Sequence, residues 1–154
     1  MTVWLRQARS TDAGKLGDIL WQNVGSGSGI LDLFSEAEAI ACVGRMIDRG
    51  WVSVGIYEDR IAGFLARDGE EIEAIYVASS LFGKGVGLAL LEDAMARCDR
   101  LRLWVHPNNG GAQRFYRRVG FVEPQNVQQG VLVLPPSSIR GISVAMEWNR
   151  GPVE

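Results

Sequence analysis

The fold is decided by residues 70–105, EEIEAIYVASSLFGKGVGLALLEDAMARCDRLRLWV. Glu70 to Val77 alternates apolar and polar residues, which indicates a half-buried strand. After a glycine-rich connection the period becomes helical, and one face of this helix carries Leu88, Leu91, Met95 and Cys98. Residues 101–105 then indicate a second strand. Because a strand, helix, strand unit normally crosses over with right-handed connectivity, we expect the two strands to lie parallel.

Two further helices are expected before this unit. Residues 3–8 alternate like a short strand, and Ser10-Thr11-Asp12 then supplies capping oxygens for a first helix. Ser35 and Glu38 have the spacing of a capping box, which predicts the start of a second helix. The apolar stripe of that helix is expected to comprise Ile40, Val43 and Ile47.

A meander of strands follows the second helix. Three runs with a period of two, residues 51–57, 61–67 and 70–77, are separated by short polar connections. Connections of this length join antiparallel neighbours. The sequence therefore predicts three consecutive antiparallel strands that end in the strand of the crossover unit.

The last third of the chain predicts one helix and at least two strands. Residues 109–119 are helical in pattern and end at Gly120, after which Phe121 to Glu123 begins a strand. The run Val131 to Leu134 is compatible with an extra hairpin arm or a long loop, and it could also serve a partner surface. Ile142 to Trp148 predicts a final strand. We expect one domain over residues 1–150 and a short tail over 151–154.

Composition narrows the class of protein. The 154 residues include 16 Lys and Arg against 18 Asp and Glu, a formal net charge of −2, which argues against nucleic-acid binding. Two cysteines, Cys42 and Cys98, are too few for a disulfide framework. No segment has the pattern of a signal peptide or a membrane span. We therefore expect a cytoplasmic protein without membrane partners, as a monomer or a homodimer.

The glycine-rich connection, residues 77–87, suits a phosphate group. Glycines let the backbone amides face one point, and the start of the following helix adds partial positive charge. The segment lacks the Walker pattern that ends in Gly-Lys-Ser/Thr, and Leu88 and Leu90 stand where the last glycine of Gly-x-Gly-x-x-Gly would be. These absences argue against a nucleotide-binding regulatory domain. A tight connection without a ligand remains the alternative.

A second segment, residues 109–121, places Asn109, Ala112 and Tyr116 on one helical face. Taken alone, it is compatible with a core tyrosine. Together the two segments resemble the GNAT superfamily of acetyl-coenzyme A-dependent N-acetyltransferases. Residues 77–87 are similar to its pyrophosphate segment, Arg/Gln-x-x-Gly-x-Gly/Ala, except that Phe82 replaces the first polar residue. Residues 109–121 are similar to its segment Asn-x-x-Ala-x-x-Phe/Leu-Tyr-x-x-x-Gly-Phe.

The resemblance covers nearly the whole chain and implies a mixed α/β fold. About seven strands would form a largely antiparallel sheet with one parallel, splayed pair, flanked by about four helices. It also implies that acetyl-CoA is the cosubstrate. The implied cofactor-binding residues are Ile75, Val77, Phe82, Gly83, Lys84, Gly85, Val86, Gly87, Asn109, Ala112 and Tyr116. Lys84 would restore the positive charge that Phe82 does not supply. No metal is implied.

The reaction implied by the resemblance sets demands on three groups. A lysine-type amine has a pKa of about 10.4, so a base must remove its proton. Glu73 is the first candidate because strand alternation places it on the face of Ile75 and Val77, and His106 or water is the alternative. An amide near Val77 would polarise the carbonyl. Tyr116 would protonate the departing thiolate, a role that the resemblance also assigns to it.

The sequence thus predicts an N-acetyltransferase that moves an acetyl group from acetyl-CoA directly to a primary amine of a small molecule or protein. The alternative is a non-catalytic domain of the same fold that senses acyl-CoA or binds a partner. The acceptor would approach around residues 21–34 and 125–140. Asp32, Glu36 and Glu38 in the first of these regions favour a cationic amine.

Overall fold

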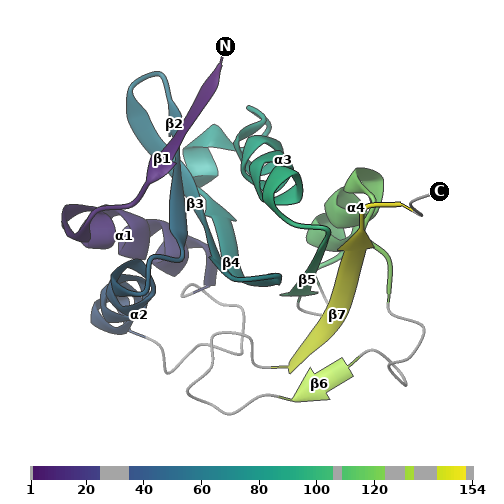
Figure 1. Cartoon of the computed structure of the whole chain (residues 1–154). Helices are drawn as coiled ribbons and strands as arrows, with labels where there is room; N and C mark the ends of the chain where they lie inside the picture. Colours follow the sequence, from purple (N-terminus) through teal and green to yellow (C-terminus); the bar gives the residue numbers. More distant parts are fainter. Residues whose placement is uncertain (1, 25–34, 106–108, 124–130, 134–141, 152–154) are drawn as a thin grey trace.

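Seven strands form one mixed sheet in the part of the chain that the structure, a computed structural model, describes: residues 2–24, 35–105, 109–123, 131–133 and 142–151. The order across the sheet is β1-β2-β3-β4-β5-β7-β6 (Figure 1). The strands are β1 (Val3–Gln7), β2 (Val52–Tyr57), β3 (Arg60–Asp68), β4 (Glu71–Val77), β5 (Arg100–Val105), β6 (Val131–Val133) and β7 (Ile142–Asn149). Only β4 and β5 pair in parallel, so the predicted topology is confirmed.

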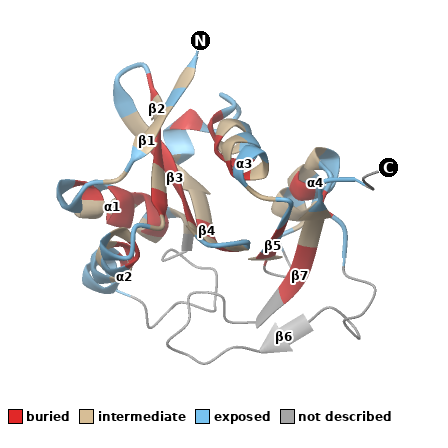
Figure 2. Cartoon of the chain, in the orientation of Figure 1, coloured by how far each residue is buried: buried red, intermediate tan, exposed pale blue. Residues whose placement is uncertain are grey.

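Helices cover both faces of the sheet. They are α1 (Ala13–Val24), α2 (Glu36–Asp48), α3 (Val86–Arg97) and α4 (Gly110–Val119), with short 3₁₀ turns η1 (Ser10–Asp12) and η2 (Ser79–Leu81). Side chains of α1 and α2 pack with β2, β3 and β4 in one apolar cluster. Side chains of α3 and α4 pack with β5 and β7 in another. The buried residues accordingly lie between helices and sheet (Figure 2).

Several local predictions are confirmed in detail. The Ser35 hydroxyl accepts from the Glu38 amide at 3.1 Å, and the Glu38 carboxylate accepts from the Ser35 amide at 2.9 Å. Glu58 and Asp59 take φ values of 50° and 62°, so they close the β2–β3 connection as a tight hairpin. The described residues contain no helix with the length and hydropathy that a membrane span requires.

The apolar stripes of two helices differ from the prediction. In α2, Ile40 is 36% exposed, whereas Ala39, Val43 and Met46 are buried. In α3, Leu88 is 40% exposed, and the buried residues are Val86, Leu90, Leu91 and Ala94. Each helix carries more apolar residues than one face can hold, so the sheet against which it packs decides which of them are buried.

The predicted strand at Phe121 to Glu123 is wrong. Val122 makes a single antiparallel bridge to Glu147, on the edge of β7 that β6 occupies further along, from Ile142 to Val144. The apolar run from Val131 is an arm of the sheet: β6 pairs with β7 from Val131 opposite Val144 to Val133 opposite Ile142. The structure therefore favours the hairpin arm over the long loop.

Helices α1 and α2 approach most closely at Gly17. A Cβ atom at this position would lie 2.5 Å from Ile40 Cγ1 and 2.6 Å from Ile40 Cα. The second contact is with backbone, which cannot move out of the way as a flexible side chain can. Glycine at residue 17 is therefore required by the helix crossing.

We expect Gly17→Ala to lower the free energy of unfolding by about 1–3 kcal/mol, because overpacking forces the two helices apart. Gly14→Ala is the matched control in the same helix, since a Cβ atom at residue 14 meets nothing within 4 Å. Urea unfolding followed by tryptophan fluorescence measures both variants. Equal stabilities for the two would show that the crossing tolerates a methyl group.

Candidate active site

The parallel strands β4 and β5 pair only where they begin. Their register contains one pair, Glu71 opposite Arg102, and the Arg102 amide donates to the Glu70 carbonyl at 2.9 Å. Beyond this point no pairing joins the two strands, although each continues for several residues (Figure 1). The interruption leaves one edge of β4 without a strand partner in the middle of the sheet.

The free edge of β4 exposes the polar backbone groups of Ile75 and Val77. The Ala78 amide donates to the Ala62 carbonyl at 2.7 Å, so Ala78 faces β3. Because successive residues of a strand face opposite edges, Ile75 and Val77 face the gap towards β5. The Val77 carbonyl accepts from Asn23 Nδ2 at 3.0 Å, and the same amide group reaches the Ile19 carbonyl at 2.9 Å. No sequence pattern indicates Asn23, which lies 54 residues from Val77 along the chain.

The glycine segment ends at the free edge of β4 and leads into α3. Gly83 and Gly85 take φ values of 79° and 84°, a left-handed conformation that favours glycine. Gly85 is the N-cap of α3 and makes no side-chain hydrogen bond to the first amides of the helix. Lys84 is exposed beside them, and Phe82 is 58% exposed. This arrangement presents backbone donors and one positive charge to an anion.

The two segments singled out in the sequence meet in space. A Cβ atom at Gly87 would lie 3.7 Å from the Phe115 ring and 3.8 Å from Val77 Cγ2. Asn109 caps α4, and its side-chain oxygen accepts from the Ala112 amide at 3.1 Å. The start of α3, the middle of α4 and the end of β4 therefore lie together at the gap.

Tyr116 lies on α4 and is 8% exposed. Its ring packs between those of Phe115 and Phe121, with centroid distances of 5.4 and 5.8 Å. Within the described part of the chain, no buried side-chain oxygen or nitrogen lacks a hydrogen-bond partner. Burial, with a smaller contribution from Tyr76, raises the pKa of the Tyr116 phenol well above its ordinary value. The phenol therefore stays protonated at neutral pH and is available as a donor.

Two further titratable groups, Tyr76 on β4 and Cys42 on α2, have raised pKa values. Tyr76 on β4 packs against Phe64, and burial, followed by the charge of Cys42, raises its pKa to about 12. Burial also raises the pKa of the Cys42 thiol. Neither residue was a candidate from the sequence, because the apolar neighbours of both indicate core positions.

The raised pKa of Tyr76 predicts a loss of stability at alkaline pH. The fold favours the protonated phenol, so this stabilisation is complete below pH 10 and is lost as the pH rises from about 10 to about 12. We expect Tyr76→Phe to lose less unfolding free energy than the wild type over this interval. Urea unfolding at several pH values measures the slopes, and parallel slopes would contradict the expectation.

Glu73 occupies a β-bulge, which changes the face on which it lies. In the β3–β4 register, Ala66 pairs with Ala74 and Arg67 pairs with Ile72, so Glu73 is the extra residue. Ile75 packs in the cluster of α3 and α4, and Ala74 in that of α1 and α2. The Glu73 charge acts on the Cys42 thiol of α2. Glu73 therefore faces α1 and α2, and the expectation that it shares a face with Ile75 and Val77 is wrong.

Other predicted positions lie outside the described residues. These are His106, the acceptor region from residue 25 to residue 34 with Asp32, and residues 124–130 and 134–141. Glu36 and Glu38 are described and exposed in the first turn of α2, and Glu38 belongs to the capping box. The described residues hold no group of three His, Cys, Asp or Glu side chains that could bind a metal ion.

Comparisons with known proteins agree with this geometry. Peptidyl-lysine N-acetyltransferase YjaB of Salmonella typhimurium is 28% identical over 123 residues, which cover 79% of this chain and 84% of the relative. A GNAT-family acetyltransferase from Bacillus cereus superposes with a TM-score of 0.72 at 14% identity, covering 99% of this chain and 100% of that chain. The PaiA N-acetyltransferase of Thermoplasma acidophilum, solved in complex with coenzyme A, has a TM-score of 0.61 at 19% identity, with coverages of 97% and 99%.

The family comparison is decisive. The acetyltransferase (GNAT) domain matches residues 40–123, which is more than half of the chain and includes β4, the glycine segment, α3, β5 and α4. The chain therefore belongs to the GNAT family of acetyltransferases, enzymes that use acetyl-CoA.

Proposed function

We propose that the protein transfers an acetyl group from acetyl-CoA directly to a primary amine of a small molecule or protein. The observation that carries the proposal is the gap between β4 and β5, where strand backbone, helix-start amides and a buried phenol meet. In the proposal, Ile75 and Val77 pair with the pantetheine arm as a strand would. The edge of β4 supports this role because its polar groups face no other strand.

The proposed cofactor contacts follow the chain from β4 into α3 and α4. The amides of residues 83–87 would hold the pyrophosphate, since they combine left-handed glycines with a helix start that has no side-chain cap. Phe82 offers no polar side chain to it, and the charge of Lys84 offsets that loss. Asn109 and Ala112 would border the arm from the side of α4. The coenzyme A found in the PaiA structure, on a similar fold, supports a coenzyme site here.

The proposed chemistry breaks the thioester C–S bond and forms an amide C–N bond. Glu73 removes one proton from the acceptor ammonium, and the neutral amine attacks the thioester carbonyl that the Val77 amide polarises. Tyr116 donates its proton to the departing sulfur. The raised pKa of Tyr116 keeps that proton in place until the thiolate develops. The nitrogen loses its second proton as the C–S bond breaks, and this proton restores the phenol through solvent, so that the amide and the thiol both leave neutral. Glu73 releases to solvent the proton that it took.

The location of the two proposed catalytic groups supports direct transfer. Glu73 faces α1 and α2, whereas Tyr116 belongs to the cluster of α3 and α4. An amine that approaches from the side of α1 and α2 would reach the thioester carbonyl in the gap. The thiol would then leave on the side of α3 and α4. This arrangement needs no acetylated side chain on the protein.

Peptidyl-lysine is the first acceptor to test, because the YjaB relatives are named for it. We further propose that the enzyme acts in the cytoplasm. Both described cysteines, Cys42 and Cys98, are free, which accords with a reducing compartment.

The proposal is tested by release of free thiol from acetyl-CoA in the presence of an amine panel, with products identified by mass spectrometry. The panel contains lysine peptides, peptide N-termini, polyamines, amino acids and aminoglycosides. We expect a mass increase of one acetyl group on at least one acceptor. Binding of acetyl-CoA without transfer to any of them would favour the alternative, an acyl-CoA sensor of the same fold.

A further inference from the structure

A pocket of ≈ 370 Å³ lies where β4 and β5 still pair, away from the gap. It is lined by Asp68, Glu70, Glu71, Arg100, Leu101, Arg102, Glu147 and Asn149. These residues come from the end of β3, the start of β4, and the paired strands β5 and β7. None of them has a role in the proposed acetyl transfer.

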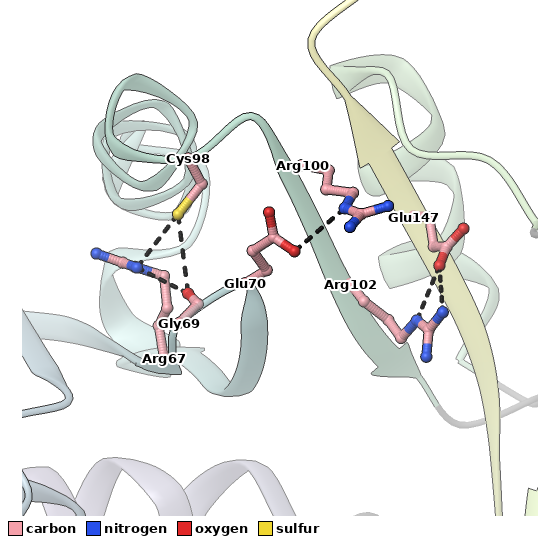
Figure 3. A network of polar contacts seen from close by, with 7 residues as sticks. All are labelled: Arg67, Gly69, Glu70, Cys98, Arg100, Arg102 and Glu147. Carbon is pink, nitrogen blue, oxygen red and sulfur yellow. Dashed lines mark hydrogen bonds and ion pairs between the residues drawn. The ribbon is translucent and has the colours of Figure 1, made fainter.

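The positive charges of this pocket are already neutralised (Figure 3). Arg100 Nε lies 3.1 Å from the Glu70 carboxylate, and Arg102 Nε lies 2.9 Å from the Glu147 carboxylate. The lining has four carboxylates against two guanidinium groups. Among the described residues, Asp68 and Glu71 form no ion pair within 4.0 Å, although the charge of Glu71 acts on Arg102. The lining therefore carries an excess of negative charge.

The side chains around this excess charge are held in place. Arg67 donates to the Gly69 carbonyl at 2.7 Å and lies 3.2 Å from Cys98 Sγ, which fixes the turn that carries Asp68 (Figure 3). The Trp104 indole N–H donates to Glu71 Oε2 at 3.0 Å across the start of the gap. This hydrogen bond fixes the direction of the Glu71 carboxylate.

The pocket opens on the same face of the sheet as Glu73. Leu101, Leu103 and Val105 of β5 pack in the cluster of α3 and α4, so the alternate residues Arg102 and Trp104 face the other side. That side is the one on which α2 and Glu73 lie. Four steps along β4 lead from Glu71 to Ile75, and because the bulge at Glu73 shortens the strand, this distance is at most about 13 Å at ~3.3 Å per residue.

We propose that this pocket, through Asp68 and Glu71, binds a second basic side chain of a peptide acceptor whose lysine is being acetylated. The inference rests on the proposed function and adds a specificity determinant to it. An extended peptide advances by about the same distance per residue as β4, so the second basic residue lies about four positions from the lysine. The excess carboxylates select a basic residue over a neutral or acidic one there.

Two capped peptides of equal length test the inference. Each contains one lysine, and the residue four positions away is arginine in one and glutamine in the other; arginine is not itself an acceptor. For the wild type we expect a KM about tenfold lower for the arginine peptide. We expect the double variant Asp68→Asn, Glu71→Gln to remove this preference while KM and kcat for the glutamine peptide change less than twofold.

Asp59→Asn is the control for the loss of one carboxylate charge and matches the single variant Asp68→Asn. It lies in the β2–β3 turn, where asparagine accepts the left-handed φ of 62°. We expect this variant to keep the full preference. Asp68→Asn alone, at an exposed position, is expected to reduce the preference about threefold and serves if the double variant does not fold. Equal KM values for the two peptides with the wild type would overturn the inference.

A failure of the proposed function gives a different result. If the wild type acetylates neither peptide, peptide acetylation fails, and fluorescence anisotropy of the labelled arginine peptide then decides the inference. Binding that is at least fivefold weaker in the double variant than in Asp59→Asn supports the pocket. Equal binding by the two variants overturns it.

Discussion

Replacing Tyr116 by phenylalanine is expected to lower kcat about a hundredfold while KM for acetyl-CoA stays within twofold. The expectation follows from the proposed role of the phenol, because a positioned general acid contributes typically 10²–10⁴-fold to a rate. The phenylalanine ring preserves the packing against Phe115 and Phe121, at centroid distances of 5.4 and 5.8 Å. Steady-state thiol release with a saturating acceptor measures the effect.

Tyr57→Phe is the matched control for this variant. Tyr57 is 7% exposed and lies in the same apolar cluster as Tyr116, but on β2, away from the gap. It should lose no more than twofold in kcat. Turnover of Tyr116→Phe equal to that of the control would remove the phenol from the mechanism and assign the proton to water.

Glu73→Gln is expected to lower kcat/KM for a lysine peptide by one to two orders of magnitude near pH 7, with a smaller loss at higher pH. A lysine-type amine has a pKa of about 10.4, so near neutral pH almost every acceptor carries the proton that Glu73 is proposed to remove. As the pH rises, the neutral fraction of the amine grows and the base matters less. Glutamine keeps the size of the side chain in the bulge.

The measurement is a pH–rate profile of Glu73→Gln beside Glu92→Gln, a control that makes the same change on the exposed surface of α3. We expect the control to follow the wild type at every pH. A Glu73→Gln profile that also coincides with the wild type would leave His106 or water as the base.

Much of the fold was predictable because local signals agree with it. Ser35 and Glu38 form the predicted capping box, the residues of the meander alternate, and Gly120 takes the left-handed φ that ends α4. The segments around Gly85 and Tyr116 could be identified because they resemble family motifs. These features depend on residues within a few positions of one another, so the sequence alone specifies them.

The remaining features depend on contacts between distant residues. Glu73 lies on the opposite face from the one expected because a bulge adds one residue to β4, and strand alternation cannot be counted through it. The Asn23 amide reaches the Val77 carbonyl only because α1 crosses the end of β4. Ile40 is partly exposed because the crossing at Gly17 fixes how α2 is rotated. No periodicity in the sequence encodes any of these arrangements.

A crystal structure of the complete chain with bound acetyl-CoA tests the central claim most directly. The quantity to measure is the distance from the Tyr116 phenol oxygen to the thioester sulfur. We predict that the phenol oxygen lies within hydrogen-bonding distance of the sulfur, and that the pantetheine amides pair with the backbone of Ile75 and Val77. A coenzyme bound outside the gap would contradict this claim. So would a phenol oxygen too far from the sulfur for a hydrogen bond, either direct or through one water molecule.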